Sequence, residues 1–362
     1  MENHILLVEP AYYSKFPPIG LLKISAFHKG QGDSTELVKF NKKTDSLPAK
    51  NPDKIYVTSL FTWTWRDVWD AVHFYRKKYP DVPVILGGIY ASLLPDHAKL
   101  SGATSLFHGI CQEVESLLPD YSIAPERDGK KWDGSIIFSS RGCHNRCKFC
   151  AVPTLEGKMN SERNSILPYI EPEYSRVIFF DNNFLANRYS GAIFDELVEL
   201  DKKVDFNQGL DAKLITEQNA KRIADLKLDD SIRLAYDSID RKKYVLKAIE
   251  RLIDAGIKKR DIFVYALFNY IDTPEDFFSR VKDILNSGVV CYPMRYEPTF
   301  AIEKNYYISP NWTPHQVQMV QQARRVIGFG GAFPGYEGLV NKFNNAGTFD
   351  EAFALRESNG RK

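Results

Sequence analysis

The chain has 362 residues, enough for two or three domains and for a core that needs no covalent staples. Hydrophobic residues make up 44% and charged residues 26%, which excludes a disordered, collagen-like or coiled-coil chain. Lys and Arg (48) nearly balance Asp and Glu (46), so an extended face for nucleic acid is not expected.

The first 125 residues alternate apolar strands with amphipathic helices, which favours a doubly wound α/β domain with a parallel sheet. The polar segment 41–53 is too short for a crossover helix, so this domain is trimmed there. A polar stretch over 120–133 is the predicted linker. Strands are predicted at 4–8, 36–40, 54–61, 82–86 and 105–108, and helices at 19–28, 65–78 and 91–100.

From residue 133 to 300 the alternation is more regular. Strands are predicted at 135–140, 176–181, 204–208, 232–237, 262–269 and 289–296, with helices at 192–203, 217–227, 242–255 and 274–286. Six such units predict a partial (β/α)6 barrel, with functional residues at the carboxyl ends of its strands. Residues 301–362 are predicted to form a helical appendix that closes one barrel end, with helices over 317–327 and 350–355 around a glycine-rich turn at 328–331.

No apolar run reaches the roughly 18–20 residues that a membrane helix needs. The N-terminus carries neither a basic segment nor a small-residue cleavage site of the kind that directs secretion. We therefore expect a cytoplasmic protein without a membrane partner.

Three of the five cysteines lie within eight residues, at Cys143, Cys147 and Cys150, directly after the first predicted barrel strand. Cys111 and Cys291 stand alone. An odd number of cysteines, clustered in this way, argues against a disulfide framework and for a metal site. Three thiolates of one loop can hold three irons of a [4Fe–4S] cluster and leave the fourth iron open for an exogenous ligand. A zinc site completed by a distant His or Cys is the alternative.

The pattern Cys-x3-Cys-x-aromatic-Cys after the first strand of a βα barrel resembles the radical S-adenosylmethionine (SAM) superfamily. The resemblance implies that SAM chelates the open iron and is cleaved reductively to a 5′-deoxyadenosyl radical, which abstracts hydrogen from a substrate. It implies that Cys143, Cys147 and Cys150 are the cluster ligands and that Phe149 contacts the adenine. It also implies an external one-electron reductant such as flavodoxin or ferredoxin, and a small-molecule or peptide substrate.

Under this resemblance, polar residues at the ends of predicted strands are candidate SAM contacts. Asp181, assisted by Asn182 or Asn183, stands where the family touches the SAM amino group. Gln208 and Asp237 follow later strands, with Asp237 at the level of the ribose, and Arg295 could pair with the SAM carboxylate or a substrate anion. Three of these residues have a structural alternative: a cap for the two aspartates, and a salt bridge at the barrel rim for Arg295.

Two segments of the first domain, Pro17 to Leu22 and Gly87 to Pro95, resemble the cobalamin-binding domain that precedes many radical SAM barrels. There, Gly87 and Gly88 imply a close approach of the nucleotide tail to the backbone. The loop 9–20 contains no histidine to bind cobalt, so a structural or substrate-docking role is the alternative to cobalamin binding. We expect Gly87, Gly88 and the loop 12–18 to border the same cleft as Cys143 and Asp181.

The main hypothesis is therefore a radical SAM enzyme that abstracts hydrogen from a substrate not specified by the sequence. The alternative is a cobalamin-dependent radical SAM C-methyltransferase, and a second alternative is a non-catalytic zinc- or cluster-binding protein. A nucleic-acid substrate is not expected, because the net charge is only +2.

Overall fold

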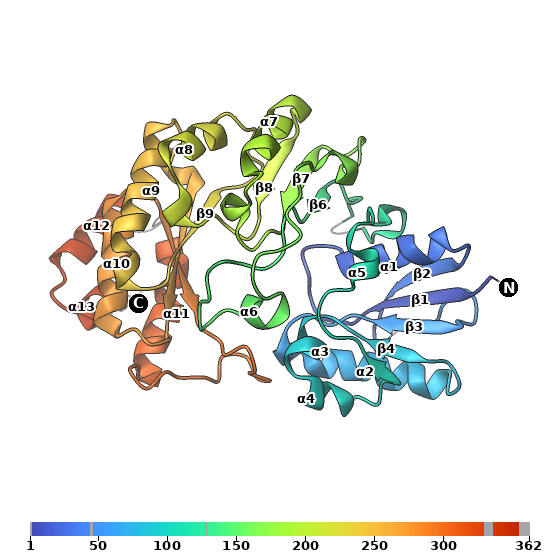
Figure 1. Ribbon diagram of the computed structural model, residues 1–362. Coiled ribbons are helices and arrows are strands. Elements are labelled where there is room, and N and C mark those ends of the chain that lie inside the picture. Colours follow the sequence, from blue (N-terminus) through green and yellow to red (C-terminus); the bar gives the residue numbers. More distant parts are fainter. Residues whose placement is uncertain (1, 44–45, 127–128, 329–335, 355–362) are drawn as a thin grey trace.

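The computed structural model describes residues 2–43, 46–126, 129–328 and 336–354, which form a parallel-sheet domain, a split barrel and a helical tail (Figure 1). Within these residues no helix has both the length and the apolar composition needed to cross a bilayer. The expected fold class, a doubly wound domain followed by a (β/α) barrel, is confirmed.

The first domain has one five-stranded parallel sheet in the order β2-β1-β3-β4-β5. Alternate side chains of β1 face opposite layers, because successive residues of a strand point to opposite sides. Leu6 and Val8 pack in the cluster of α2, whereas Ile5 and Leu7 pack with Leu21 of α1. The elements are β1 (His4–Glu9), α1 (Ile19–Gly30), β2 (Ser34–Lys39), β3 (Lys54–Val57), α2 (Trp65–Lys78), β4 (Val84–Leu86), α3 (Ile89–Leu93), α4 (Pro95–Lys99), β5 (Ser105–Leu106) and α5 (Gln112–Glu115).

Two local features of this domain bear on the expectations. No helix connects β2 to β3 in the described part of that connection, as the shortness of 41–53 predicts. The helix expected over 91–100 is two short helices instead, α3 and α4. Pro95 occupies the first position of α4, and a proline ring cannot sit inside a continuous helix.

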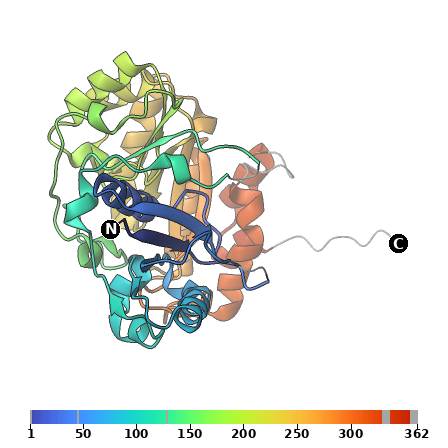
Figure 2. The same cartoon turned by 90° about the vertical axis from the view of Figure 1, so that its right-hand side faces the viewer.

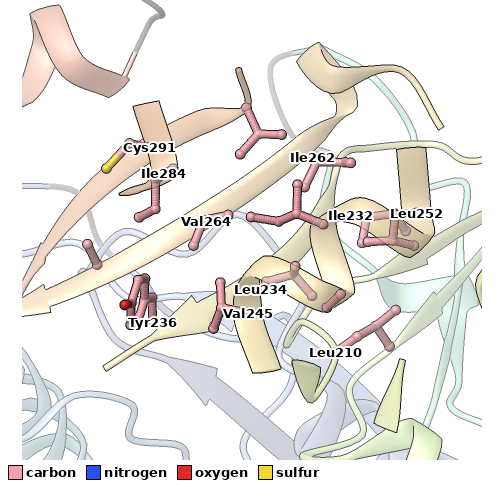
Figure 3. Packing of buried hydrophobic residues seen from close by; sticks show 14 of the residues in the cluster. Leu210, Ile232, Leu234, Tyr236, Val245, Leu252, Ile262, Val264, Ile284 and Cys291 are labelled. Atoms are coloured by element: carbon pink, nitrogen blue, oxygen red, sulfur yellow. The ribbon is translucent and has the colours of Figure 1, made fainter. Parts of the chain in front are cut away.

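The barrel strands form two parallel three-stranded sheets, β6-β7-β8 and β9-β10-β11, rather than one continuous sheet. At the join, the Leu210 amide donates to the Arg233 carbonyl at 2.8 Å, and Arg233 pairs with Asp205 at 2.5 Å. Figure 3 shows the packed interior around β9 and β10, where Cys291 is one of the buried residues. The elements are β6 (Ser135–Ile137), α6 (Val152–Leu155), β7 (Arg176–Phe179), α7 (Ser190–Leu200), β8 (Lys203–Phe206), α8 (Glu217–Ala224), β9 (Ile232–Tyr236), α9 (Lys242–Asp254), β10 (Ile262–Phe268), α10 (Pro274–Asn286) and β11 (Val290–Arg295).

The tail holds α11 (Pro314–Gly328), α12 (Tyr336–Asn345) and α13 (Phe349–Phe353). It packs along β11 and α10 (Figure 2). The expectation that it closes one end of the barrel is therefore wrong. Its aromatic residues join the barrel core, where the rings of Phe277 and Phe353 lie 5.5 Å apart. Most of the expected glycine-rich turn, residues 329–331, lies outside the described residues.

Candidate cluster and cofactor site

The cysteine loop leaves β6 through a turn that requires glycine. Gly142 has a φ of +70°, and a Cβ atom there would collide with the Lys158 carbonyl. Beside it, the backbones of Arg141 and Asn160 exchange two hydrogen bonds of 2.9 Å. This pairing closes the base of the segment that carries the three cysteines and α6.

All three thiols of the motif line one cavity, which is open to solvent. The amide of Asn145 donates to Cys143 Sγ and that of Val152 to Cys150 Sγ, each at 3.4 Å. A [4Fe–4S] cluster places each cysteine on a different iron, so it needs three sulfurs around one space, and this loop meets that need. Across the described residues, no three His, Cys, Asp or Glu side chains converge on a single-ion site.

The thiols of the loop are held in a setting that disfavours their charge. Burial raises the pKa of Cys147 and of Cys150, and the Asp237 carboxylate adds to both shifts. Cluster ligands are thiolates, so the positive iron must offset this cost when it binds.

Asn183 connects the cysteine loop to the strand ends of the barrel. Its Nδ2 lies 3.8 Å from Cys143 Sγ and donates to Asp211 at 3.3 Å, while Asn145 donates to the same carboxylate at 2.7 Å. The side chain is 3% exposed and lines the cavity, yet its Oδ1 accepts no hydrogen bond from any residue that the structure describes. A buried acceptor without a donor is costly, so this oxygen is suited to receive one from a ligand.

Asp181 does not line the cavity, contrary to the expectation that it contacts SAM. It is 1% exposed, and its two oxygens accept four hydrogen bonds of 2.6–2.9 Å from the amides and hydroxyls of Ser139 and Ser140. Burial raises the pKa of Asp181 to about 6, although the hydrogen bonds from the two serines act to lower it. It therefore ties the end of β7 to the residues that follow β6, which is the capping alternative.

Asn182 belongs to a network that holds the base of the loop. Its Nδ2 donates to Glu156 at 2.8 Å, and the same carboxylate accepts from the Gly142 amide at 2.8 Å and pairs with Arg141 at 3.3 Å. Arg141 in turn makes a two-point bond to Glu115 of α5, at 2.7 and 2.9 Å. Through Glu115, the first domain thus binds Arg141 at the start of the cysteine loop.

Glu115 is itself buried and held from three sides. Lys23 of α1 donates to its backbone carbonyl at 2.7 Å and to its carboxylate at 3.3 Å, and Arg163 donates to the carbonyl at 3.2 Å. The cations beside it hold the pKa of Glu115 below its usual value, against the effect of burial. These bonds satisfy the charge that the two domains bury between them.

Gln208 and Asp237 line the cavity from the ends of β8 and β9. Neither side chain has a hydrogen bond to any residue in the described part of the chain. Burial raises the pKa of Asp237 to about 6, and the positive charges of Arg280 and Arg241 act to lower it. The two side chains are thus free to contact a bound ligand.

Arg295 faces away from the cavity, so the expected pairing with SAM or a substrate anion is wrong. In the β10–β11 register Tyr292 opposes Tyr265, which lines the cavity, whereas Arg295 opposes Phe268, which packs in the outer core. Its guanidinium lies 3.5 Å from Glu297 and donates to the carbonyls of Asn305 and Tyr307. This is the rim salt bridge of the structural alternative.

Phe149 lines the cavity and meets Tyr270 edge to face, with ring centroids 5.6 Å apart. The contact fixes the ring between the cysteine loop and the end of β10. An apolar face beside the thiols is suited to a flat base, which agrees with the place expected for adenine.

Gly87 and Gly88 directly follow β4, whose carboxyl end points toward the barrel (Figure 1), but they do not line the cavity of the cysteines. Gly88 has a φ of +101°, and a Cβ atom would collide with the Ser59 carbonyl. The helix that follows, α3, packs on α6 just after the cysteine loop (Figure 1). In the loop 12–18, Phe16 meets Phe180 with ring centroids 4.8 Å apart. The expected common cleft is therefore not found, because neither the two glycines nor the loop 12–18 lines the cavity of the cysteines.

Three further cavity residues were not anticipated: Lys213, Arg241 and Tyr244. The Lys213 ammonium lies 5.1 Å from the centre of the Tyr244 ring. Neither Lys213 nor Arg241 has a carboxylate within ion-pair distance in the described ranges. Both follow predicted strand ends by four or five residues, so extending each strand end by one turn would have found them.

Comparison with known proteins adds independent information, although no family model matches the chain. The ribosomal protein uS12 methylthiotransferase RimO of Helicobacter pylori (strain P12) is 35% identical over 77 residues, 20% of this chain and 17% of that protein. Hopanoid C-2 methylase of Rhodopseudomonas palustris (strain TIE-1) is 26% identical over 237 residues, 52% of this chain and 42% of that protein. The chain thus spans less than half the length of these curated relatives.

Two solved structures of the radical S-adenosylmethionine methyltransferase TsrM from Kitasatospora setae share the fold. The one with cobalamin and a [4Fe–4S] cluster matches with a TM-score of 0.67 at 14% identity, over 83% of this chain and 77% of that one. The other, with tryptophan and a SAM analogue, matches with a TM-score of 0.64. The likeness extends over more than the barrel, because the barrel alone is too short to make up 83% of the chain.

The cysteine motif, its place after the first barrel strand, the preceding parallel-sheet domain and these relatives agree with one another. The chain thus shares its fold with a radical SAM methyltransferase that binds cobalamin and a [4Fe–4S] cluster, and parts of its sequence are similar to a methylthiotransferase and to a hopanoid methylase.

Proposed function

We propose that this protein is a cobalamin-dependent radical SAM methyltransferase acting on a small molecule. The observation that carries the proposal is the cavity in which three thiols meet polar groups that lack partners. Cys143, Cys147 and Cys150 would hold a [4Fe–4S] cluster, and the adjoining space would hold SAM. The likeness to the methyltransferase TsrM and to a hopanoid methylase supports methyl transfer better than the main hypothesis of hydrogen abstraction alone.

Different residues of the cavity would contact different parts of SAM. The unpartnered Oδ1 of Asn183 would accept a hydrogen bond from the SAM ammonium, next to the thiol of Cys143. Asp237, which has no hydrogen bond to a described residue either, would accept from the ribose hydroxyls, and Phe149 would pack on the adenine. A bound cluster would supply low-potential electrons, and Glu156 and Arg141 would hold the loop through their bonds to Gly142 and to each other.

The first domain offers a fitting place for cobalamin at the carboxyl edge of its sheet, where ligands of doubly wound folds bind. Four segments that follow strands at that edge expose large apolar side chains: Tyr13 (84%), Phe61 (44%), Ile89 at the start of α3 (38%) and Phe107 (41%). Such surface is costly to leave in water and suits a broad, partly apolar ligand. The loop 9–20 has no histidine, so the corrin would be held by packing rather than by a cobalt–imidazole bond. Bound cobalamin would carry the methyl group.

Anaerobic reconstitution tests this proposal. The purified chain is loaded with iron and sulfide, then supplied with methyl-labelled SAM, a reductant and cobalamin. We expect about four irons per chain, retained cobalamin, and S-adenosylhomocysteine as the SAM product. If 5′-deoxyadenosine is the only product of SAM and no cobalamin is retained, methyl transfer is contradicted and hydrogen abstraction alone is supported.

A pair of cysteine variants provides the control. Cys147→Ala should lose most of the iron and the broad absorption near 400 nm, because one iron loses its ligand. Cys111→Ala, on a half-buried cysteine outside the motif, should keep both. Full iron content in Cys147→Ala would contradict the assigned ligands.

A further inference from the structure

The inner face of the sheet β9-β10-β11 is not filled by its own side chains. Ala235, Tyr265 and Tyr292 lie opposite one another in register, so their side chains share one face of the three strands. That face is the inner one, because Ala235 and Tyr265 line the cavity of the cysteines. In a closed barrel such residues are packed, but here Ala235 is exposed, and Met294, two residues beyond Tyr292, is 39% exposed. The interior therefore has room for a ligand.

Three aromatic rings make this inner face largely apolar. Phe263, Tyr265 and Tyr292 contact one another, with ring centroids 5.2–5.6 Å apart. Each of the three remains partly accessible to solvent. The Tyr265 hydroxyl has no hydrogen-bond partner among the residues that the structure describes. A ligand here would meet an apolar wall and one hydroxyl able to donate.

The tail helix α11 places a cation at the edge of this aromatic wall. The Arg324 guanidinium lies 4.2 Å from the centre of the Tyr292 ring and donates to the Tyr292 hydroxyl. That bond leaves most of its donors open, and no carboxylate lies within ion-pair distance in the described parts of the chain. Burial lowers the pKa of Arg324, so a bound anion would stabilise its charge. Arg233, on the same face, is by contrast already paired with Asp205 and Asp230.

We propose that Arg324 and Tyr265 bind the carboxylate of a small organic acid. Its apolar body would lie against the aromatic wall and face the cavity of the cysteines. A planar guanidinium matches a carboxylate in shape, and its single charge balances a monoanion. A phosphate monoester carries nearly two charges and would leave one of them uncompensated. The assignment of this acid as the substrate rests on the proposed function, whereas its binding does not.

Two ligands of the same shape test the site. Phenylacetate carries a carboxylate, and phenylacetamide replaces it by a neutral amide. Saturation-transfer NMR on the full chain should give a millimolar dissociation constant for phenylacetate and an affinity for phenylacetamide lower on the order of tenfold. Phenyl phosphate should bind more weakly than phenylacetate. Equal binding of acid and amide, no binding of phenylacetate up to about 20 mM, or a preference for the phosphate would overturn the proposal.

Variants locate the binding of phenylacetate. Arg324→Gln should weaken it on the order of tenfold, and Tyr265→Phe, which breaks no hydrogen bond with a described residue, should weaken it a few-fold. The matched control is Arg325→Gln, at the next and exposed position of α11, which should bind like the unaltered protein. Equal affinities in Arg324→Gln and Arg325→Gln would contradict the site. If Arg324→Gln does not fold, Tyr265→Phe and the comparison of acid with amide decide.

SAM has a carboxylate of its own and is the other candidate occupant. The SAM affinity of the cluster-loaded chain, measured by equilibrium dialysis, should be the same in Arg324→Gln as in the unaltered protein. A loss of about tenfold would assign Arg324 to SAM and overturn the organic-acid site. Failure of the unaltered chain to load iron would overturn the proposed function but leave phenylacetate binding intact. A loaded cluster without phenylacetate binding would overturn only the organic-acid site.

Discussion

Two carboxylates at the ends of barrel strands, Asp181 after β7 and Asp237 after β9, have similar acidity and opposite surroundings. Burial raises the pKa of each to about 6. Asp181 accepts four hydrogen bonds from Ser139 and Ser140, whereas Asp237 faces the cavity without a hydrogen bond from any described residue. A raised pKa therefore reports burial in both, and only the hydrogen-bond partners separate a residue that holds the fold from one that awaits a ligand.

The largest expected effect is on stability at Asp181. In Asp181→Asn the side-chain NH2 would face donors of Ser139 and Ser140, because an amide has only one acceptor oxygen. We expect the free energy of unfolding to fall by about 2–3 kcal/mol. Chemical denaturation of the cluster-free protein measures it. A loss under about 0.5 kcal/mol would show that the four bonds contribute little.

The same substitution at Asp237 should act with the opposite sign. Asp237→Asn removes a buried charge and breaks no hydrogen bond, so unfolding of the cluster-free protein should cost about 1–2 kcal/mol more at pH 7. SAM affinity of the loaded protein, measured by equilibrium dialysis, should weaken about tenfold, because a carboxylate is the stronger acceptor for ribose hydroxyls. Unchanged affinity would remove Asp237 from the ligand site.

The pH dependence of that gain follows from the raised pKa. Between the unfolded value of 3.8 and the folded value of about 6, the folded state binds more protons than the unfolded state. The stability of the unaltered protein therefore falls as the pH rises through this window. The advantage of Asp237→Asn should be full above about pH 6 and vanish below about pH 4. A constant difference across this range would show that its cause is not ionisation.

The smallest expected effect is at Gln208, which lines the cavity but is exposed. Gln208→Ala breaks no hydrogen bond among the described residues, so the free energy of unfolding should change by less than about 0.5 kcal/mol. SAM affinity should weaken a few-fold, measured as for Asp237. A stability loss above about 1 kcal/mol would show that Gln208 supports the fold, like Asp181, and does not serve only a ligand, as proposed for Asp237.

The sequence predicted features that depend on neighbouring residues. The cysteine spacing places all three thiols on one loop, and that loop lines one cavity. The length of 41–53 excludes a crossover helix, and the structure has none in the described part. Pro95 could have signalled the break between α3 and α4, because proline disrupts a helix wherever it falls inside one.

The sequence could not separate residues whose roles depend on distant partners. Asp181 and Asp237 look alike in sequence, and only the two serines from another strand end satisfy Asp181. The direction of Arg295 depends on the register of β10 against β11, where a shift by one residue exchanges inside and outside. The Oδ1 of Asn183 accepts no hydrogen bond from a described residue, because its neighbours Asp211 and Cys143 engage the Nδ2 side of the amide instead. These neighbours are distant in sequence.

The bond between Glu115 and Arg141 limits how the two domains of this protein can be exchanged. The carboxylate belongs to the first domain and the guanidinium to the start of the cysteine loop, and both are largely buried. Removing one partner of such a pair leaves an uncompensated charge, at a cost of about 3–5 kcal/mol. A barrel expressed without its first domain would instead expose Arg141 to water, and the start of the cofactor loop would lose its two hydrogen bonds to Glu115. A chimera with a foreign first domain should therefore tolerate the exchange only if the new partner presents a carboxylate at the same place.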